Sequence, residues 1–201
     1  MTMRAISFCN QKGGTGKTTT TAALAGALRE RGRFVALIDL DPQGCLSLVS
    51  SGVHQIRPPD LPGVLRGLAG MDYVLIDAPP SLGEATRASL EAADGVIIPT
   101  LPEFLALRGL GSLLGLIEPG KLIGILVLGF RKRTKHHRRV LEKIEGLGHP
   151  VLAIVPFSIS ASDAGLIGKD LVAYSPAKSR GIVAAYRQLA EEVERWAEKI
   201  G

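Results

Sequence analysis

A glycine-rich segment near the start of the chain constrains the fold more than any other feature of the sequence. Residues 10–20 read NQKGGTGKTTT, a short apolar run at residues 4–9 comes before them, and residues 17–32 carry Ala and Leu at helical spacing. A strand, a glycine-rich turn and a helix in this order form a phosphate-binding loop, because glycines let backbone N–H groups point inward and the helix dipole adds positive potential. We therefore expect an α/β protein that binds a nucleotide.

Apolar runs and segments with helical spacing alternate along the rest of the chain. The runs are continuously apolar and do not alternate between apolar and polar residues, which indicates strands buried on both faces of a sheet. Helical crossovers between such strands predict a doubly wound, mainly parallel sheet with helices on both faces. Residues 51–62 contain two adjacent prolines and no clear period, so we expect a loop there. The expected strands are residues 4–9, 33–40, 71–79, 95–100, 121–130 and 149–157, and the expected helices are residues 17–32, 81–94, 103–117, 134–146 and 179–199.

Length and composition favour a single domain, residues 1–201. Hydrophobic residues make up 46% of the chain, which is enough for a substantial core. No apolar run approaches the roughly 20 residues of a membrane helix, and the N-terminus lacks the pattern of a signal peptide. The two cysteines, Cys9 and Cys45, are not spaced for a zinc site or a disulfide framework. We expect reduced thiols and a cytoplasmic protein.

The residues of the glycine-rich segment predict the phosphates of a nucleotide and Mg²⁺ as ligands. Lys17 would reach the β- and γ-phosphates, and the Thr18 hydroxyl would bind Mg²⁺. A strict phosphate-loop pattern has glycine at position 11, whereas this chain has Gln11 followed by a second lysine, Lys12. The predicted nucleotide-binding residues of the loop are Gly13, Gly14, Thr15, Gly16, Lys17, Thr18 and Thr19.

The segment KGGTGKTT resembles the deviant phosphate loop of the ParA/MinD class of ATPases. Two further segments fit this resemblance, LIDLDPQG at residues 37–44 and YVLIDAPPS at residues 73–81, and the match continues through AADGVIIPTLPEFLALRGL and YSPAKSRGIVAAYRQLAEEV. The resemblance covers nearly the whole chain and is most specific in the first 45 residues. It implies a P-loop NTPase fold. Because the first strand starts at Arg4, the chain is most similar to the small plasmid-type partition ATPases, which have no N-terminal DNA-binding domain.

The acidic residues at two strand ends complete the expected site. Asp77 ends a buried strand beside the phosphate loop, where an aspartate can orient Mg²⁺ and its waters. The resemblance implies that Asp41 positions or activates the attacking water. Asp39 has two open interpretations, a structural acid at the strand end or a member of the magnesium shell. Pro156 and Phe157 resemble the family segment that packs the adenine base, with core packing as the alternative.

The resemblance also gives the second lysine a role. In the family the first lysine of the loop crosses a dimer interface and reaches the phosphates bound by the partner subunit. It neutralises charge on the transferring phosphoryl group, as an arginine finger does. The expected catalytic residues are therefore Lys12, Lys17 and Asp41, and we expect ATP to produce a homodimer.

The last helix does not match the membrane-binding helix of MinD. The face opposite its apolar stripe carries both acids and bases, whereas a helix on a membrane surface prefers a cationic face. We expect the helix to pack on the sheet, with Trp196 as a core anchor, and we expect no membrane partner. Its apolar stripe is Tyr186, Leu189, Val193, Trp196 and Ile200.

A basic segment, RKRTKHHRR at residues 131–139, is the candidate DNA contact. No acid lies between Glu118 and Glu142, although the net charge of the whole chain is only +5. A density this high favours contacts to DNA phosphates without sequence preference, with a solvated loop and helix start as the alternative. The predicted DNA-binding residues are Arg131, Lys132, Arg133, Lys135, Arg138 and Arg139.

These observations lead to an expected function. We expect an ATP-hydrolysing DNA segregation protein, associated with the nucleoid in the cytoplasm. Its ATP dimer holds DNA until a centromere-binding, ParB-like partner stimulates hydrolysis and release. One alternative is a MinD-like positioning ATPase that acts on a protein complex or a membrane. A second alternative is an amidoligase-type biosynthetic enzyme that shares the phosphate loop.

Overall fold

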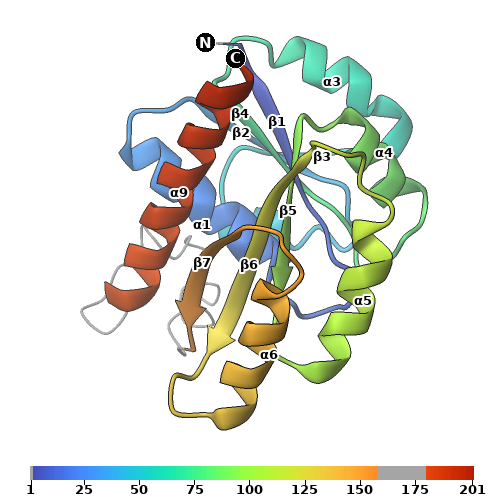
Figure 1. Cartoon of the computed structure of the whole chain (residues 1–201). Coiled ribbons are helices and arrows are strands. Elements are labelled where there is room, and N and C mark those ends of the chain that lie inside the picture. The colour runs from blue at the N-terminus through green and yellow to red at the C-terminus, as the bar shows by residue number, and fades with distance from the viewer. Residues whose placement is uncertain (1, 158–179) are drawn as a thin grey trace.

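A seven-stranded parallel sheet forms the centre of the molecule (Figure 1). The structure is a computed structural model that describes residues 2–157 and 180–201. The order across the sheet is β3-β2-β4-β1-β5-β6-β7, and every neighbouring pair is parallel. The strands are β1 Arg4–Phe8, β2 Val35–Asp39, β3 Val53–Gln55, β4 Tyr73–Asp77, β5 Gly95–Thr100, β6 Leu122–Phe130 and β7 Val151–Pro156.

Continuous apolar runs produce the central strands, as the sequence predicts. Every residue of β2, β4 and β5 is buried, because helices cover both faces of the sheet there. The chain fills one side of β1 with β2, β3 and β4 and then crosses to the other side for β5, β6 and β7. In such sheets ligands bind at the carboxyl ends of the strands, near the point where the order reverses. The doubly wound parallel fold is confirmed.

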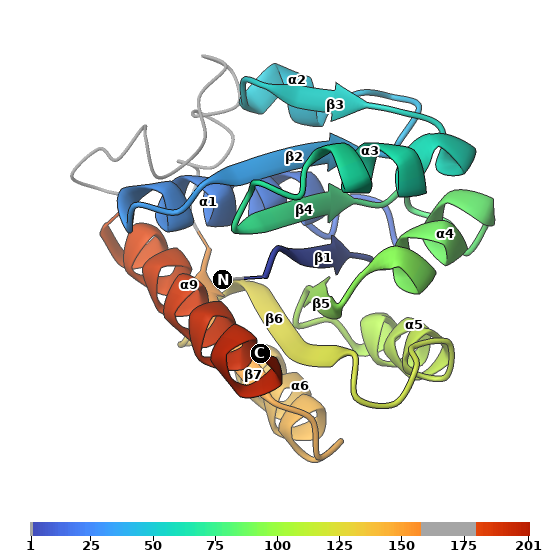
Figure 2. The ribbon, with the colours of Figure 1, turned by 90° about the horizontal axis from the view of Figure 1, so that it is seen from above.

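Two layers of helices cover the sheet (Figure 2). Helices α1 and α9 pack on one face through a shared core cluster that includes Leu24, Leu28 and Leu189. Helices α4, α5 and α6 pack on the opposite face, and α3 covers that face beside β2 and β4. The bounds are α1 Lys17–Glu30, α2 Leu46–Val49, α3 Leu61–Gly67, α4 Glu84–Ala92, α5 Phe104–Leu114, α6 Lys135–Glu145 and α9 Arg180–Ile200.

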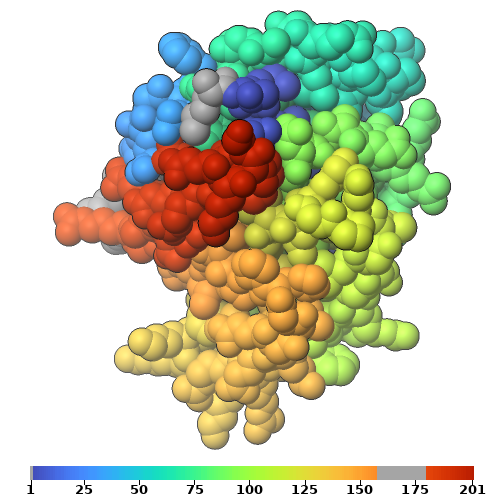
Figure 3. Space-filling view, turned by 45° about the horizontal axis from the view of Figure 1, so that its top comes forward, coloured from blue at the N-terminus to red at the C-terminus, as the bar shows by residue number. Residues whose placement is uncertain are grey.

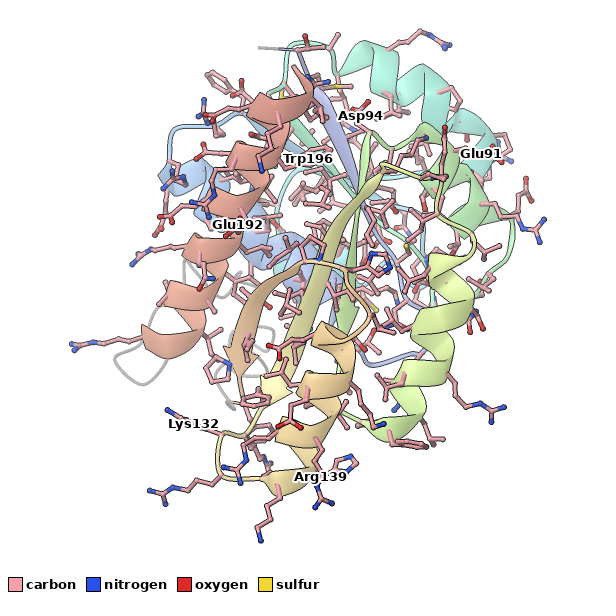
Figure 4. The ribbon with its side chains drawn as sticks, in the orientation of Figure 1. Glu91, Asp94, Lys132, Arg139, Glu192 and Trp196 are labelled. Carbon is pink, nitrogen blue, oxygen red and sulfur yellow. The ribbon has the colours of Figure 1, made fainter. Side chains whose placement is uncertain are left out.

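Helix α9 packs its apolar stripe against the sheet and α1. Tyr186, Leu189 and Val193 are buried, and Trp196 lies over Gly95, where a β-carbon would come within 2.5 Å of the indole (Figure 4). The expected core role of Trp196 is therefore confirmed. Ile200, the last residue of α9, is 45% exposed and does not extend the buried stripe. Figure 3 shows the end of α9 beside the N-terminal residues.

The expectation of a loop at residues 51–62 is wrong. Val53–Gln55 form β3, which pairs with β2 at the edge of the sheet. A short 3₁₀ helix, η1, follows at Pro58–Asp60, and α3 begins at Leu61. Three residues are too few to show a strand period, and the paired prolines start a helical turn, where their missing N–H groups are not needed. No helix within the described residues is long and apolar enough to cross a membrane.

Candidate active site

The glycine-rich loop joins β1 to α1 at the carboxyl edge of the sheet. Gly14 and Gly16 have φ angles of +72° and +82°, a left-handed backbone that favours glycine. A β-carbon at Gly16 would also lie 2.6 Å from Leu128 Cδ1, so the loop passes too close to β6 for a side chain. The geometry fits a loop that turns its backbone inward.

Asn10 anchors this loop to the sheet, a role that the sequence reasoning missed. Its side-chain amide donates a hydrogen bond of 2.7 Å to the Pro99 carbonyl on β5, and its Oδ1 accepts the Lys12 N–H at 3.0 Å. The Thr15 hydroxyl then donates to the Lys12 carbonyl at 3.2 Å. The polar residue between an apolar strand and the glycines was the available signal, because a buried side chain there must find hydrogen-bond partners.

Lys17 opens α1 and is almost completely buried, with 7% of the residue exposed. Burial lowers its pKa, while Asp77 and Asp41 act in the opposite direction. No side chain of the described residues caps the N-terminus of α1, and its first turn has no acid. The first N–H groups of α1 and the Lys17 ammonium together form a site for an anion.

Asp77 ends β4 directly beside Lys17 and Thr18. The Thr18 hydroxyl donates to Asp77 Oδ2 at 2.6 Å, while Oδ1 is buried and finds no hydrogen-bond partner in the described part of the chain. The pKa of Asp77 is raised to about 7, mainly by burial; Asp39 and Asp41 act in the same direction, and Thr18 and Lys17 act against it. A buried carboxylate oxygen without a partner is a strong candidate for binding a cation or its water.

The donor set fits Mg²⁺ rather than a metal held by the protein alone. Within residues 2–157 and 180–201, no group of three or more His, Cys, Asp or Glu residues could hold a metal ion. Magnesium is commonly bound by one or two protein oxygens together with waters and substrate phosphates. Thr18 and Asp77, which are joined by a hydrogen bond, could supply the protein share of such a shell.

Asp39 and Asp41 occupy different positions despite their close spacing. Asp39 is 1% exposed, and its two oxygens accept the N–H groups of Asp41 at 2.9 Å and Leu46 at 3.1 Å. These bonds favour the structural interpretation of Asp39, which shapes the turn after β2. Asp41 is half-buried, and its Oδ1 accepts the Gln43 N–H at 3.0 Å. Asp41 follows the carboxyl end of β2, at the same edge of the sheet as the phosphate loop, and its charge opposes the lowering of the Lys17 pKa.

Lys12 is held outside the group formed by Lys17, Thr18 and Asp77. Its ammonium forms an ion pair with the carboxylate of Glu103, the N-cap residue of α5, and both side chains are 47% exposed. The next two residues, Phe104 and Leu105, are 59% and 72% exposed. The carboxyl edge of the sheet thus presents a lysine, a carboxylate and two apolar side chains on its surface.

A hollow of about 270 Å³ lies beside the phosphate loop. Pro156 and Phe157 line it together with Gly14, Thr15, Gly16 and Thr19, as expected of a wall for a nucleotide base. The sequence reasoning missed the remaining walls, which come from β6, β7, α9 and the segment after β5. These walls are Leu101, Leu128, Gly129, Val155, Ile182 and Tyr186. A larger surface hollow of about 670 Å³ lies between η1 and α4 and includes none of the predicted site residues.

The basic segment occupies the turn after β6 and the first turns of α6. All six predicted DNA-binding side chains belong to exposed residues, and Lys132 and Arg139 project from the same end of the molecule as the strand ends (Figure 4). One of the six, Arg131, stacks its guanidinium 3.9 Å from the centre of the Phe157 ring. The imidazole of His137 accepts the Arg131 N–H at 3.1 Å, so this histidine has a structural role.

Comparison with known proteins identifies the family. The model described as "CobQ/CobB/MinD/ParA nucleotide binding domain" matches residues 6–172. The chain belongs to this ParA/MinD family. The chromosome-partitioning ATPase Soj of Thermus thermophilus is 33% identical over 239 aligned residues, covering 95% of this chain and 95% of that protein. The chromosome partitioning protein ParA of Myxococcus xanthus is 32% identical, covering 94% of this chain and 87% of that protein.

Solved structures of ParA/MinD relatives carry the ligands that the loop predicts. The septum site-determining protein MinD of Pyrococcus horikoshii, complexed with Mg-ADP, has a TM-score of 0.80 at 25% identity and covers 99% of each chain. A cobyrinic acid a,c-diamide synthase of Mycobacterium smegmatis, with bound ATP analog and magnesium, has a TM-score of 0.80 at 29% identity, covering 99% of this chain and 97% of that one. ParA/MinD domains are nucleotide-binding, and this family membership supports an ATPase.

Proposed function

We propose that the 201 residues form one ATPase domain that segregates DNA by an ATP-driven cycle of dimerisation, DNA binding and release. One observation carries the proposal: the phosphate loop and an acid-free basic segment lie at the same edge of the sheet. An edge of this kind can couple nucleotide binding to the capture of a polyanion. Relatives named as chromosome-partitioning proteins support the choice of DNA as that polyanion.

The chain's own groups suit the hydrolysis of a bound triphosphate. The loop N–H groups and the Lys17 ammonium bind the β- and γ-phosphates, and burial makes this charge interaction stronger than it would be in water. Thr18 and Asp77 hold Mg²⁺, which neutralises charge on the phosphate oxygens when bound. The carboxylate of Asp41 orients the attacking water. Asp39 keeps the turn that carries Asp41 in place through its two backbone hydrogen bonds.

Lys12 acts on the phosphates of a second copy of the chain. Its ion pair with Glu103 keeps it at the surface in a single copy, where a partner can reach it. An exposed ion pair contributes only about 0.2–1 kcal/mol, so the partner's phosphates can displace Glu103 at little cost. The exposed Phe104 and Leu105 adjoin this pair and gain from burial when two copies meet.

The basic segment binds DNA phosphates. Lys135 and Arg138 lie in the first turn of α6, where no acid is present. Cations are unfavourable at a helix N-terminus, because the helix dipole is positive there. The arrangement therefore does not serve the stability of α6, but it concentrates positive potential for an anionic partner. Contacts to phosphates carry no base information, so we expect binding without sequence preference.

The test is a mobility shift on random duplex DNA with ATP and with ADP. Pairing with ATP places two basic segments on one assembly, so affinity should be higher with ATP through bivalency. Binding should also fall steeply with salt, because each neutralised phosphate releases about 0.9 of a counterion. A triple variant, Arg133→Ala with Arg138→Ala and Arg139→Ala, should lose DNA binding and keep ATP binding.

A charge-matched control separates the basic segment from net charge. Arg66, Lys143 and Lys199 are exposed residues in the last turns of α3, α6 and α9, away from the carboxyl edge of the sheet. Replacing these three by Ala removes the same charge and should leave most of the DNA affinity. Equal losses in the two triple variants would show that only overall charge matters.

Two other functions remain as outcomes of this experiment. Failure of the wild-type ATP form to bind DNA at low salt would favour a MinD-like ATPase whose cargo is a protein complex or a membrane. ATP consumption that requires a carboxylic acid and an ammonia donor would favour an amidoligase-type enzyme, a class that the cobyrinic acid a,c-diamide synthase structure represents. If the main proposal holds, a centromere-binding, ParB-like partner stimulates turnover of the DNA-bound dimer at the nucleoid.

A further inference from the structure

One of the six basic side chains is already engaged by an aromatic ring. The guanidinium carbon of Arg131 lies 3.9 Å from the centre of the Phe157 ring, well within the distance at which a cation is attracted to the ring face. The Phe157 N–H donates to the Phe130 carbonyl at 3.0 Å, which joins the end of β7 to the end of β6. Arg131 directly follows β6, so the stack connects two adjacent strand ends.

The backbone of Arg131 is also fixed. Its N–H donates to His137 Nδ1 at 3.1 Å, and the His137 ring lies 6.0 Å from the Phe130 ring, centre to centre. Burial lowers the pKa of His137, and His136 and Arg131 lower it further against the opposing effect of Glu103. A lowered pKa favours the neutral imidazole, which can accept this hydrogen bond. The turn therefore holds Arg131 in place on both its backbone and its side chain.

Phe157 itself faces the phosphate site. It is 53% exposed and lines the hollow that also contains Gly14, Thr15 and Thr19 of the phosphate loop and start of α1. In the described residues, Arg131 does not line that hollow, so the guanidinium supports the ring from outside it. The cation on one face of the ring favours the orientation in which Phe157 lines the hollow.

We propose that Arg131 is a positioning residue of the nucleotide site, which holds Phe157 as the wall for the base of ATP, and is not a DNA contact. This inference rests on the proposed function, because it takes ATP as the ligand. It removes Arg131 from the predicted DNA-binding set and leaves Lys132, Arg133, Lys135, Arg138 and Arg139 to bind DNA. A phosphate contact by Arg131 would require the guanidinium to leave the ring.

The test compares ATP with inorganic tripolyphosphate, which carries a similar charge without a base. Titration calorimetry measures both affinities in the presence of Mg²⁺. Arg131→Ala should weaken ATP binding about two- to fivefold, the range expected for an exposed cation–π contact. Tripolyphosphate affinity should be unchanged, because the phosphate loop is intact. Arg131→Lys should fall between the wild type and Arg131→Ala, since an ammonium retains part of the attraction to the ring.

Two further variants separate positioning from general effects on charge or folding. Arg133→Ala removes a cation from the same turn and should leave ATP affinity unchanged while weakening DNA binding. Phe157→Leu keeps an apolar side chain and removes the ring face, so it should weaken ATP binding by itself. In that background Arg131→Ala should cause no further loss of ATP affinity, because the two residues act through one contact.

Several results would overturn the inference. Equal losses for ATP and tripolyphosphate in Arg131→Ala would mean that Arg131 acts through its charge on the phosphates. Unchanged ATP affinity together with reduced DNA binding would return Arg131 to the DNA-binding set. Additive losses in the double variant would mean that Arg131 does not act through Phe157. If the wild type binds tripolyphosphate but not ATP, the proposed function is overturned as well.

Discussion

Asp77→Asn should stabilise the nucleotide-free protein and at the same time weaken its binding of magnesium and ATP. Burial is the main reason that the pKa of Asp77 is raised from 3.8 to about 7. Because the folded pKa lies above the unfolded value, the free energy of unfolding decreases as the pH rises from about 4 to about 7. Above about pH 7 Asp77 is ionised in the folded protein, and its destabilising effect on the free energy of unfolding is at its maximum.

The size of the effect follows from this shift. One pKa unit corresponds to about 1.4 kcal/mol, so ionised Asp77 destabilises the folded protein by up to about 4 kcal/mol at pH 8. Asparagine removes this charge and can still accept the Thr18 hydroxyl, but its buried amide nitrogen loses about 1–3 kcal/mol if it finds no acceptor. The net gain is about 1–3 kcal/mol, which corresponds to a rise in Tm of about 3–9 °C for a chain of this length.

Thermal unfolding followed by circular dichroism checks this prediction. With EDTA and no nucleotide, Asp77→Asn should melt above the wild type at pH 8, and the gain should largely disappear at pH 5. With magnesium and ATP the order should reverse, because the wild type alone gains the full stabilisation by ligand. A suitable control is Asp94→Asn at the amino edge of the sheet, since Asp94 accepts the Ala5 N–H at 2.8 Å (Figure 4).

Two results would refute this reasoning. A lower Tm for metal-free Asp77→Asn at pH 8 would mean that the ionised carboxylate is not destabilised by its surroundings. An equal gain at pH 5 and pH 8 would mean that the effect does not come from ionisation. The Asp94→Asn control should show no gain at pH 8, because this change only weakens a hydrogen bond to the backbone.

Three further predictions concern other parts of the molecule. Lys12→Ala should keep its affinity for ATP in calorimetry but should not form the ATP-dependent dimer in sedimentation. If this variant dimerises like the wild type, Lys12 does not act on the phosphates of a second copy. Asp41→Ala should bind ATP without hydrolysing it, so the ATP-bound dimer should accumulate and be visible by size-exclusion chromatography. Normal ATP hydrolysis by this variant would mean that another residue orients the attacking water. Burial opposes the ionisation of Glu194, but hydrogen bonds from Arg31 and Arg33 outweigh it and lower its pKa, so the stability from this network is present above about pH 4.5 and is lost in acid. Glu194→Gln should therefore lower the free energy of unfolding by about 1–2 kcal/mol at pH 7 in urea melts, with a smaller difference at pH 3.

Six of the seven strands and the five longest helices in the described part of the chain could be predicted from the sequence because their signals are local, whereas the short helices α2 and α3 were missed. Continuous apolar runs such as the one that forms β4 identify a buried strand without any knowledge of its neighbours. β3 gave no such signal, since a three-residue edge strand depends on pairing with β2. The end of α9 was misjudged for a related reason: Ile200 has the correct helical spacing, but helical spacing does not show whether a neighbouring element covers the residue, and Ile200 is 45% exposed.

The phosphate loop could likewise be predicted from residues close together in the chain, whereas its surroundings could not. Leu128 and Tyr186 line the hollow beside the loop although they are far from it in sequence. The different environments of Asp39 and Asp41 depend on hydrogen bonds to a turn that no sequence pattern specifies. Arg131 was grouped with its basic neighbours because its contact with Phe157 joins two strand ends that only the folded sheet brings together.

The dependence of ATP hydrolysis on protein concentration tests the central claim most directly. If Lys12 completes the site of a second copy, activity per molecule should rise from nanomolar to micromolar protein and then level off as the dimer forms. Lys12→Ala should remain slow at every concentration. Constant activity per molecule across this range, together with normal turnover by Lys12→Ala, would show that one copy hydrolyses ATP alone and would contradict the proposed ATP-driven pairing.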